Sequence, residues 1–407
     1  MDFLRQTIEF TGLAKEYNAV NLGQGFPDYP APAYVTKALA EVASSSNCLM
    51  HQYTRGFGHP RLVNALGKMY ERLLNRPVEP LKNILITNGA YAALFYSVFG
   101  LLNPGDEALI VEPVYDCYVP MVKMAGGVPV FAPLRLKSTN SSQMTSADLQ
   151  LDLAELESKF TSKTKLLFLC NPNNPVGKVY SKTELEGIAE IVRRYLNVVV
   201  ISDEVYEWMI HDGEMIRFAT LPGMWERTIT IGSAGKTFSV TGWKVGWAIA
   251  PRNILTCLEM VHQNCVYTCP TPLQEAVGIA YEHEMKQLDS PECYFNSLSK
   301  ELQPKRDSLA EGLRHAGLNP VIPQGGYFMI ADYSSLGYKP DSNNPAWKDN
   351  QFVRWLTKEK KLATIPVTSF TYEPSHARMY EDYIRFCFFK DEPTINDGLE
   401  ILNKLSL

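Results

Sequence analysis

The stretch Ser-Ala-Gly-Lys-Thr-Phe-Ser-Val-Thr-Gly-Trp-Lys-Val-Gly-Trp at 233–247 is the most informative part of this sequence. It places Lys236 among small residues, directly after the apolar run 228–231, and a second lysine, Lys244, between two tryptophans. A lysine amine is a nucleophile only when it is neutral, so its site must lower its pKa or hold it in an imine. Small neighbours leave room for a flat cofactor, and Lys244 with the nearby Ser233 suits a phosphate. These features indicate pyridoxal 5′-phosphate (PLP) bound as a Schiff base on Lys236. The alternative is a pair of surface lysines around a glycine-rich turn.

Length and composition limit the class of protein. The chain has 407 residues, more than one hydrophobic core usually holds, so we expect two domains or one large α/β unit. The apolar fraction of 45% and the charged fraction of 20% are typical of a globular protein. The net charge of −5 gives no reason to expect nucleic acid or an anionic membrane as a partner.

Targeting and redox signals favour an intracellular protein. No apolar run reaches the roughly 18 residues that span a bilayer, and the first residues lack the pattern of a secretory signal. The eight cysteines are scattered, as in a reduced protein, and no Cys–His cluster suggests a metal site. We therefore expect a cytoplasmic protein without a metal, or a mitochondrial one if a leader precedes this sequence.

The order of apolar runs predicts an α/β fold. Between about residues 36 and 285, short runs that are apolar on both faces alternate with helix-like segments such as 61–74 and 183–195. This pattern predicts three layers, with a mostly parallel sheet covered by helices on both sides. The expected strands are 83–87, 107–111, 128–131, 166–170, 198–202 and 228–231.

The pattern changes near residue 285. A long charged helix is expected at 299–316, followed by the isolated apolar strand 383–388. These features indicate a smaller α+β domain. We predict a large cofactor-binding domain at 35–284 and a small domain made of 1–34 and 285–407.

Polar residues follow several of the expected strands, where ligands bind in parallel sheets. Asp203 ends a buried run, and a buried acid is costly unless it has a cationic partner such as a protonated pyridine nitrogen. Tyr206, three residues on, could donate to the phenolate oxygen of the cofactor. Alternatively, Asp203 is a helix N-cap, a position that Asp favours.

Two more strand ends carry polar signals. Asn174 lies in the loop 171–177, which two prolines and Gly177 make tight, and it could bridge the phenolate oxygen and a substrate carboxylate. The alternative is a simple turn. The segment Asn-Gly-Ala-Tyr at 88–91 opens a helix whose free N–H groups could bind phosphate. The sequence has neither G-x-G-x-x-G nor a Walker lysine motif, so a nicotinamide or nucleotide site has little support.

Three further residues have both a functional and a structural interpretation. Tyr115 could stack on a flat heterocycle or pack in the core. Arg385, inside an apolar strand, requires an anion, which could be a substrate carboxylate held by its planar fork or an acidic side chain. Gly25 could let the backbone approach a ligand, or it could be a turn glycine.

Taken together, the motifs identify a family resemblance that runs in order along nearly the whole chain. The sequence resembles fold-type I PLP-dependent aminotransferases of the kynurenine aminotransferase (cysteine-S-conjugate β-lyase) branch, type III in particular. The motifs are Asn-Leu-Gly-Gln-Gly-Phe-Pro-Asp at 21–28, Gln-Tyr-Thr-Arg-Gly-Phe-Gly-His-Pro at 52–60, Ser-Asp-Glu-Val-Tyr at 202–206, Gly-Ser-Ala-Gly-Lys-Thr-Phe-Ser at 232–239 and Thr-Pro-Leu-Gln-Glu-Ala at 271–276.

The resemblance implies a role for each candidate residue. Lys236 matches the Schiff-base lysine and proton carrier, and Asp203 the partner of the pyridinium nitrogen. The phenolate oxygen would be met by Tyr206 and Asn174, and Tyr115 matches the stacking ring. The phosphate cup would consist of Ser233, Lys244, Gly89 and Ala90.

The substrate contacts follow in the same way. Arg385 matches the clamp for the α-carboxylate, Gly25 and Asn174 match further substrate contacts, and Tyr91 would line the pocket. Tyr53 matches a tyrosine that reaches the phosphate of the neighbouring subunit, which implies a homodimer with shared sites.

The resemblance implies an aminotransferase that moves the amino group of kynurenine, glutamine or other large neutral or aromatic amino acids to a 2-oxo acid. A β-lyase acting on cysteine S-conjugates would use the same residues. A third alternative is a catalytically silent binding protein on the same scaffold.

Overall fold

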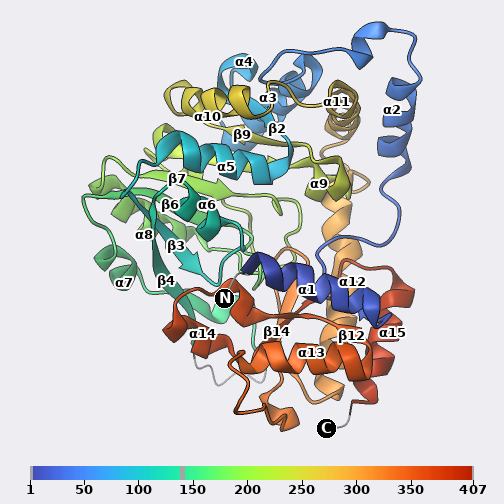
Figure 1. Cartoon of the computed structure of the whole chain (residues 1–407). Coiled ribbons are helices and arrows are strands. Elements are labelled where there is room, and N and C mark those ends of the chain that lie inside the picture. The colour runs from blue at the N-terminus through green and yellow to red at the C-terminus, as the bar shows by residue number, and fades with distance from the viewer. Residues whose placement is uncertain (1–2, 138–142, 406–407) are drawn as a thin grey trace.

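The computed structural model describes residues 3–137 and 143–405, which form two connected parts (Figure 1). The upper part in Figure 1 contains an eight-stranded sheet with its covering helices, and the lower part contains a four-stranded sheet packed against α13 (Lys348–Lys360) and α15 (Glu392–Asn403). Helix α12 (Tyr294–His315) runs between the two parts, and α1 (Phe3–Glu16) lies across the lower one.

The large sheet has the order β2-β9-β8-β7-β6-β3-β4-β5. Its central strands β8, β7, β6, β3 and β4 are parallel to one another, which confirms the mostly parallel α/β fold. The strand bounds are β2 Ile84–Thr87, β3 Glu107–Glu112, β4 Val128–Leu136, β5 Leu149–Leu151, β6 Thr164–Cys170, β7 Val199–Asp203, β8 Thr228–Ser233 and β9 Gly246–Ile249.

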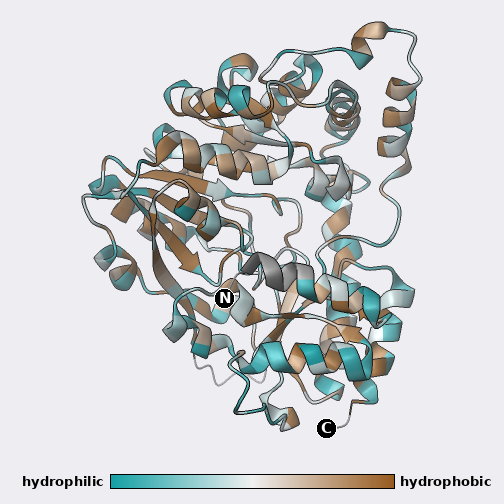
Figure 2. Cartoon of the chain, in the orientation of Figure 1, coloured by the Kyte–Doolittle hydropathy of each residue, from teal (hydrophilic) through white to brown (hydrophobic). Residues whose placement is uncertain are grey.

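Side chains alternate between the two faces of this sheet. In β6, Leu166 and Phe168 belong to one core and Leu167 and Leu169 to another. Alternation with a period of two therefore buries both faces of one apolar strand. The first core includes side chains of α5, α6 and α10, and the second those of α8; Figure 2 shows these strands as hydrophobic between helices of mixed polarity.

Local sequence explains where several helices begin. Ser181 and Glu184 form a reciprocal capping box at the start of α8, and Pro60 is the first residue of α3. These are the helices predicted at 183–195 and 61–74. The helices of this part are α2 Ala33–Ala43, α3 Pro60–Leu74, α4 Pro80–Asn83, α5 Gly89–Leu101, α6 Tyr118–Met124, α7 Leu153–Ser158, α8 Lys182–Arg194, α9 Ala234–Thr237, α10 Arg252–Cys265 and α11 Thr271–Met285.

The smaller sheet is antiparallel, with the order β10-β11-β14-β13. Its strands are β10 Asn319–Val321, β11 Phe328–Asp332, β13 Ile365–Pro366 and β14 Tyr383–Cys387, and the short strands β1 (Val20–Asn21) and β12 (Leu362–Ala363) pair nearby. The predicted helix 299–316 is α12, which begins five residues earlier, and α14 (Pro374–Tyr380) precedes β14. The strands of the large sheet come from residues 84–249 and those of the small sheet from 319–387; the exact domain limits stay a prediction.

Two strands of the large sheet were absent from the sequence-based prediction. β9 is antiparallel to both β2 and β8, and β5 is an antiparallel edge strand. Both are short, and only the four-residue helix α9 and one 3-10 turn separate β9 from β8, so the strand–helix alternation did not indicate β9. Within residues 3–137 and 143–405, no helix combines the length and apolarity that crossing a bilayer requires.

Candidate active site

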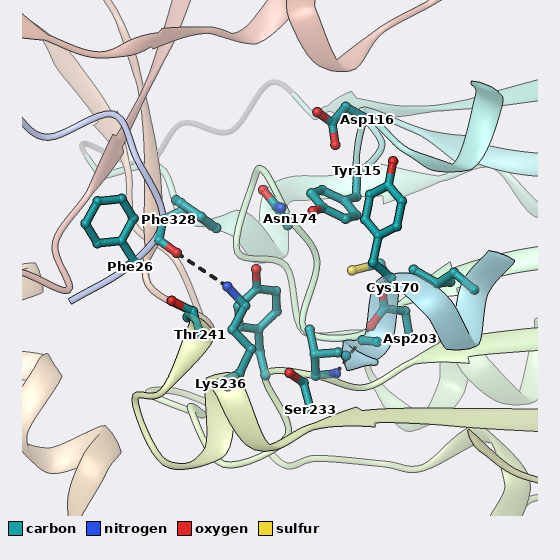
Figure 3. Close-up of a pocket in the computed structure, with 18 of the residues that line it drawn as sticks. Phe26, Tyr115, Asp116, Cys170, Asn174, Asp203, Ser233, Lys236, Thr241 and Phe328 are labelled. Carbon is teal, nitrogen blue, oxygen red and sulfur yellow. Dashed lines mark hydrogen bonds between the residues drawn. The ribbon is translucent and has the colours of Figure 1, made fainter. Parts of the chain in front are cut away.

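A cavity of about 320 Å³ lies at the carboxyl ends of the parallel strands, where they face the smaller sheet (Figure 3). Twelve of the thirteen predicted site residues line it: Gly25, Gly89, Ala90, Tyr91, Tyr115, Asn174, Asp203, Tyr206, Ser233, Lys236, Lys244 and Arg385. The structure thus gathers residues that are scattered over 360 positions of the sequence.

Lys236 lies on the short helix α9, directly after β8. Its Nζ donates to the Gly25 carbonyl at 3.3 Å, the dashed line in Figure 3, and to the Tyr327 hydroxyl at 2.6 Å. Burial lowers the pKa of the Lys236 amine to about 8. A substantial fraction of this amine is therefore neutral near pH 8, as a nucleophile or base requires.

Asp203 is the last residue of β7 and is almost completely buried. Its Oδ2 accepts from the Tyr118 hydroxyl at 2.5 Å, and its Oδ1 accepts from the Val205 N–H at 3.4 Å. Burial raises the pKa of the Asp203 carboxyl to about 6, against the opposing effect of the Tyr118 hydrogen bond. The N-cap interpretation is wrong, because the chain turns after Asp203 and its next helical segment begins at Phe218.

Arg385, on β14, is held from several sides. Its Nη1 donates to Asn174 Oδ1 and its Nη2 to the Gly23 carbonyl, both at 2.9 Å. The guanidinium carbon lies 3.9 Å from the ring centroid of Phe328 and 4.6 Å from that of Phe370.

The guanidinium of Arg385 has a donor that its hydrogen bonds leave unused. Its two Nη atoms donate to an amide oxygen and a carbonyl oxygen, and its Nε is buried without a hydrogen-bond partner. A buried guanidinium with an unused donor beside a cavity fits a carboxylate ligand.

Backbone at the other end of the cavity forms a tight cup. Gly89 opens α5 with a φ of +77°, which a glycine adopts without strain. Gly246 packs beneath it, since a Cβ there would lie 2.4 Å from the Ala90 nitrogen. A Cβ at Gly89 would lie 3.3 Å from Lys244 Nζ, so an amine and the first N–H groups of a helix converge next to Ser233.

Aromatic side chains line the walls. Tyr115 contacts Tyr118 edge-on at 5.9 Å between ring centroids, and Tyr206 contacts Tyr327 edge-on at 5.2 Å. Tyr91 is 41% exposed, and its ring centroid is 5.9 Å from Lys244 Nζ.

Tyr53 is the one predicted residue outside the cavity. Its side chain is 81% exposed and contacts only the edge of Tyr267 among the aromatic rings of the described chain. The shared-site role therefore stays a prediction.

Sequence reasoning missed two residues that contact the buried ionisable groups. The sequence patterns assigned no role to Tyr118 or Tyr327. Their position next to Asp203 and Lys236 depends on contacts between residues 85 and 91 positions apart. Further lining residues that were missed are Phe26, Cys170, Phe328 and Phe370.

The donor set fits PLP. The cup of Ser233, Lys244 and the start of α5 suits a phosphate, the buried Asp203 suits a protonated ring nitrogen, and Lys236 supplies an amine of lowered pKa. The chemistry of these residues matches each polar end of the cofactor.

Comparison with known proteins gives the same picture. Residues 17–402 match the family described as aminotransferase class I and II. Kynurenine–oxoglutarate transaminase 3 of Mus musculus is 52% identical over 396 residues, which cover 97% of this chain and 86% of the relative. Transaminase 1 of the same species, also a kynurenine–oxoglutarate transaminase, is 47% identical over 394 residues, covering 95% and 92%. The solved structure of Bna3p, a candidate kynurenine aminotransferase of Saccharomyces cerevisiae, has a TM-score of 0.91 at 31% identity, over 99% of this chain and 96% of Bna3p.

Proposed function

The chain belongs to the aminotransferase class I and II family, and we propose that it takes the amino group of kynurenine, glutamine or another large neutral or aromatic amino acid and passes it to a 2-oxo acid. The family and the full-length similarity make it a PLP-dependent aminotransferase. The class of donor is the proposal.

When bound, PLP supplies an electron sink for the electrons released at the α-carbon of the substrate. The chain's own residues do the rest. Arg385 already donates to Asn174 and Gly23, and it binds the α-carboxylate with its remaining N–H donors. The α-carbon is therefore held at a fixed place. Lys236, once free, takes the proton from that carbon, and Asp203 supports the positive charge of the cofactor ring.

The composition of the cavity wall carries the proposal for the donor. Apart from Lys244, which is assigned to the phosphate, Arg385 and Lys236 are the cations of the lining, and its rings include Phe26, Tyr91, Tyr115, Phe328 and Phe370. Acidic donors such as aspartate would need a second cation for their side-chain carboxylate. Rings instead favour a large apolar or aromatic side chain.

A panel of donors and acceptors tests this proposal. We expect kcat/KM for kynurenine, glutamine and phenylalanine to exceed that for aspartate by at least about tenfold, the discrimination that one unpaired buried group gives. A preference for aspartate would contradict it. Thiol release from a cysteine S-conjugate, measured in parallel, reports the β-lyase alternative.

We also propose that two chains form a homodimer with shared sites. The exposed aromatic pair Tyr53 and Tyr267, 5.6 Å apart, together with the 65% exposed Leu49, supports this. Such a surface suits contact with a second copy, and Tyr53 is free to reach a site other than its own.

The finer location is a proposal as well. All eight cysteines are free, which supports a reducing compartment such as the cytoplasm. Cell fractionation would distinguish this from the mitochondrial matrix.

A further inference from the structure

Tyr327 makes a direct contact with the catalytic amine, although no motif pointed to it. It lies just before β11, in the part of the chain that carries Arg385, and its side chain is completely buried. The Lys236 Nζ donates to its hydroxyl at 2.6 Å, and that hydroxyl donates to the Gly25 carbonyl at 2.8 Å.

Tyr327 stays a hydroxyl under all relevant conditions. Burial raises the pKa of its phenol. Its single O–H is directed to Gly25, so the oxygen faces Lys236 as an acceptor. The ring is fixed by edge-on contact with Tyr206 and by packing against Phe389, with ring centroids 5.2 Å away in each case.

The absence of a side chain at position 25 makes this arrangement feasible. A Cβ there would lie 2.4 Å from the Phe328 ring and 3.3 Å from the Tyr327 ring. Glycine therefore lets the carbonyl come close enough to accept from Tyr327 and, at 3.3 Å, from Lys236 as well.

The three groups match the valence of a neutral amine. A neutral amine has two N–H groups and one lone pair, whereas an ammonium has three N–H groups. The Tyr327 oxygen and the Gly25 carbonyl accept two N–H groups. The remaining position of the nitrogen is left for its lone pair, which is the part that takes a proton.

We propose that Tyr327 is a positioning residue for Lys236: it holds the free amine, together with Gly25, so that the lone pair is presented to the cavity for proton transfer. This inference rests on the proposed role of Lys236 as the proton carrier, and it does not depend on which donor is used. The titratable or charged groups around the amine are Asp203, Tyr206, Lys244, Arg385 and Cys387, and the variants below leave all of them in place.

The test compares Tyr327→Phe with Tyr380→Phe. Tyr380 is a matched control because it is also buried and its hydroxyl also donates to a backbone carbonyl, that of Leu134 at 2.8 Å, outside the active site. Both variants lose one hydroxyl that donates to a backbone carbonyl.

The first readout is independent of turnover. Protein loaded with pyridoxamine 5′-phosphate, in which no bond joins Lys236 to the cofactor, is pulse-labelled with an amine-reactive reagent over a pH series, and labelling of Lys236 is measured by peptide mass spectrometry. A hydrogen-bond acceptor stabilises an ammonium more than a neutral amine, so losing the Tyr327 oxygen should lower the pKa of Lys236. In Tyr327→Phe, the pH midpoint of Lys236 labelling should therefore fall by about half to one pH unit. It should stay unchanged in Tyr380→Phe.

The second readout is the isotope effect on kcat with an α-deuterated amino donor. If Tyr327 aligns the amine, Tyr327→Phe should lower kcat by about tenfold to a hundredfold with little change in KM, and it should increase the isotope effect. A midpoint and an isotope effect both equal to those of the unmodified enzyme, with only a lower melting temperature, would overturn the proposal.

A second variant tests the proposal if Tyr327→Phe folds poorly. 3-Fluorotyrosine at position 327 keeps the ring and the hydroxyl but makes the oxygen a weaker acceptor, so a smaller midpoint shift in the same direction is expected, and an unchanged midpoint counts against the proposal. Failure of the proposed function would look different, since the unmodified enzyme would not turn over kynurenine while the labelling shift remained.

Discussion

At the scale of residues, burial gives the site its chemistry. Lys236 and Asp203 have pKa values displaced toward each other, to about 8 and about 6, and in both cases the main cause is burial. Lys236 could be predicted from its small neighbours, and Asp203 from its place at a strand end. Tyr118 and Tyr327 could not, because a tyrosine in an apolar segment has the same sequence signature whether or not its hydroxyl contacts an ionisable group.

The structure favours the clamp interpretation of Arg385 and predicts the effect of Arg385→Lys. The guanidinium fork contacts Asn174 and Gly23 and still has donors for a carboxylate. A lysine keeps the positive charge but lacks this fork. We expect KM to rise about tenfold to a hundredfold for every amino acid and oxo acid, as loss of a bidentate charged contact implies. Steady-state kinetics measures this, with the melting temperature recorded on the same preparation. Unchanged KM with a lower melting temperature would instead support a structural salt bridge.

Asp203→Asn should lower kcat about a hundredfold or more, far more than it weakens cofactor binding, because a preorganised charge is lost from the reaction while the shape remains. Near-normal turnover in the variant, with bound cofactor verified by absorbance, would exclude the role.

The raised pKa of Asp203 also affects stability. Between the ordinary carboxyl value of 3.8 and about 6, the folded chain without cofactor holds a proton at this site that the unfolded chain has lost. Its free energy of unfolding therefore falls as the pH rises through this window. Urea titrations of cofactor-free protein at pH 4 and pH 6 should show a smaller fall for Asp203→Asn than for the unmodified chain.

At the scale of elements, the apolar runs predicted the parallel core of the sheet, and the helix-like segment 183–195 predicted α8. They could not predict the antiparallel strand β9, because direction depends on which neighbours a strand pairs with, not on its own residues. Gly246, its first residue, pairs with Thr87 on one side and Ser233 on the other. An antiparallel strand thus contributes its beginning to the edge of the sheet where the parallel strands end.

This placement predicts that Gly246→Ala weakens cofactor binding. The added Cβ would lie 2.4 Å from backbone atoms of Gly89 and Ala90, so α5 must move away from the cup. We expect a loss of about tenfold in PLP affinity with a stability cost of about 1–3 kcal/mol, typical of overpacking. Gly242→Ala is the control, because a Cβ there meets nothing within 4 Å. PLP affinity measured by fluorescence titration should fall only in Gly246→Ala, and equal affinities would contradict this account of the cup.

At the scale of the whole molecule, the site exists only where the two parts of the chain meet. Lys236 and Asp203 come from the large sheet, whereas Arg385 and Tyr327 come from the region of the small one. Hydrogen bonds cross between these parts, from Arg385 to Asn174 and from Lys236 to Tyr327. Any relative movement of the two parts therefore changes the surroundings of both the Arg385 guanidinium and the Lys236 amine. The alternation of apolar runs predicted the large part and its end near residue 285 predicted the small one, but the contacts between them depend on tertiary packing that no local pattern encodes.

The proposed homodimer makes a prediction at the same scale, through mixing of two inactive chains. Lys236→Ala removes the proton carrier, and Tyr53→Ala removes the exposed ring expected to reach the neighbouring site. If sites are shared, a hybrid dimer has one site that lacks both groups and one that lacks neither. Random exchange of equal amounts should then restore about a quarter of the activity of the unmodified enzyme, since half of the dimers are hybrids with one intact site each.

The mixing experiment separates the alternatives because each gives a different activity. If Tyr53 acts within its own chain, no hybrid site is intact, and the mixture shows only the mean of the two separate preparations. Assays at limiting PLP increase the contrast, because a lost phosphate contact weakens cofactor binding more than the reaction itself. Tyr267→Ala in place of Tyr53→Ala is the control, since the Tyr267 ring packs on Tyr53 at the same surface but is not expected to reach the phosphate.

Sedimentation of each mixture verifies that dimers formed. Dimers without recovered activity would show that Tyr53 does not complete the neighbouring site.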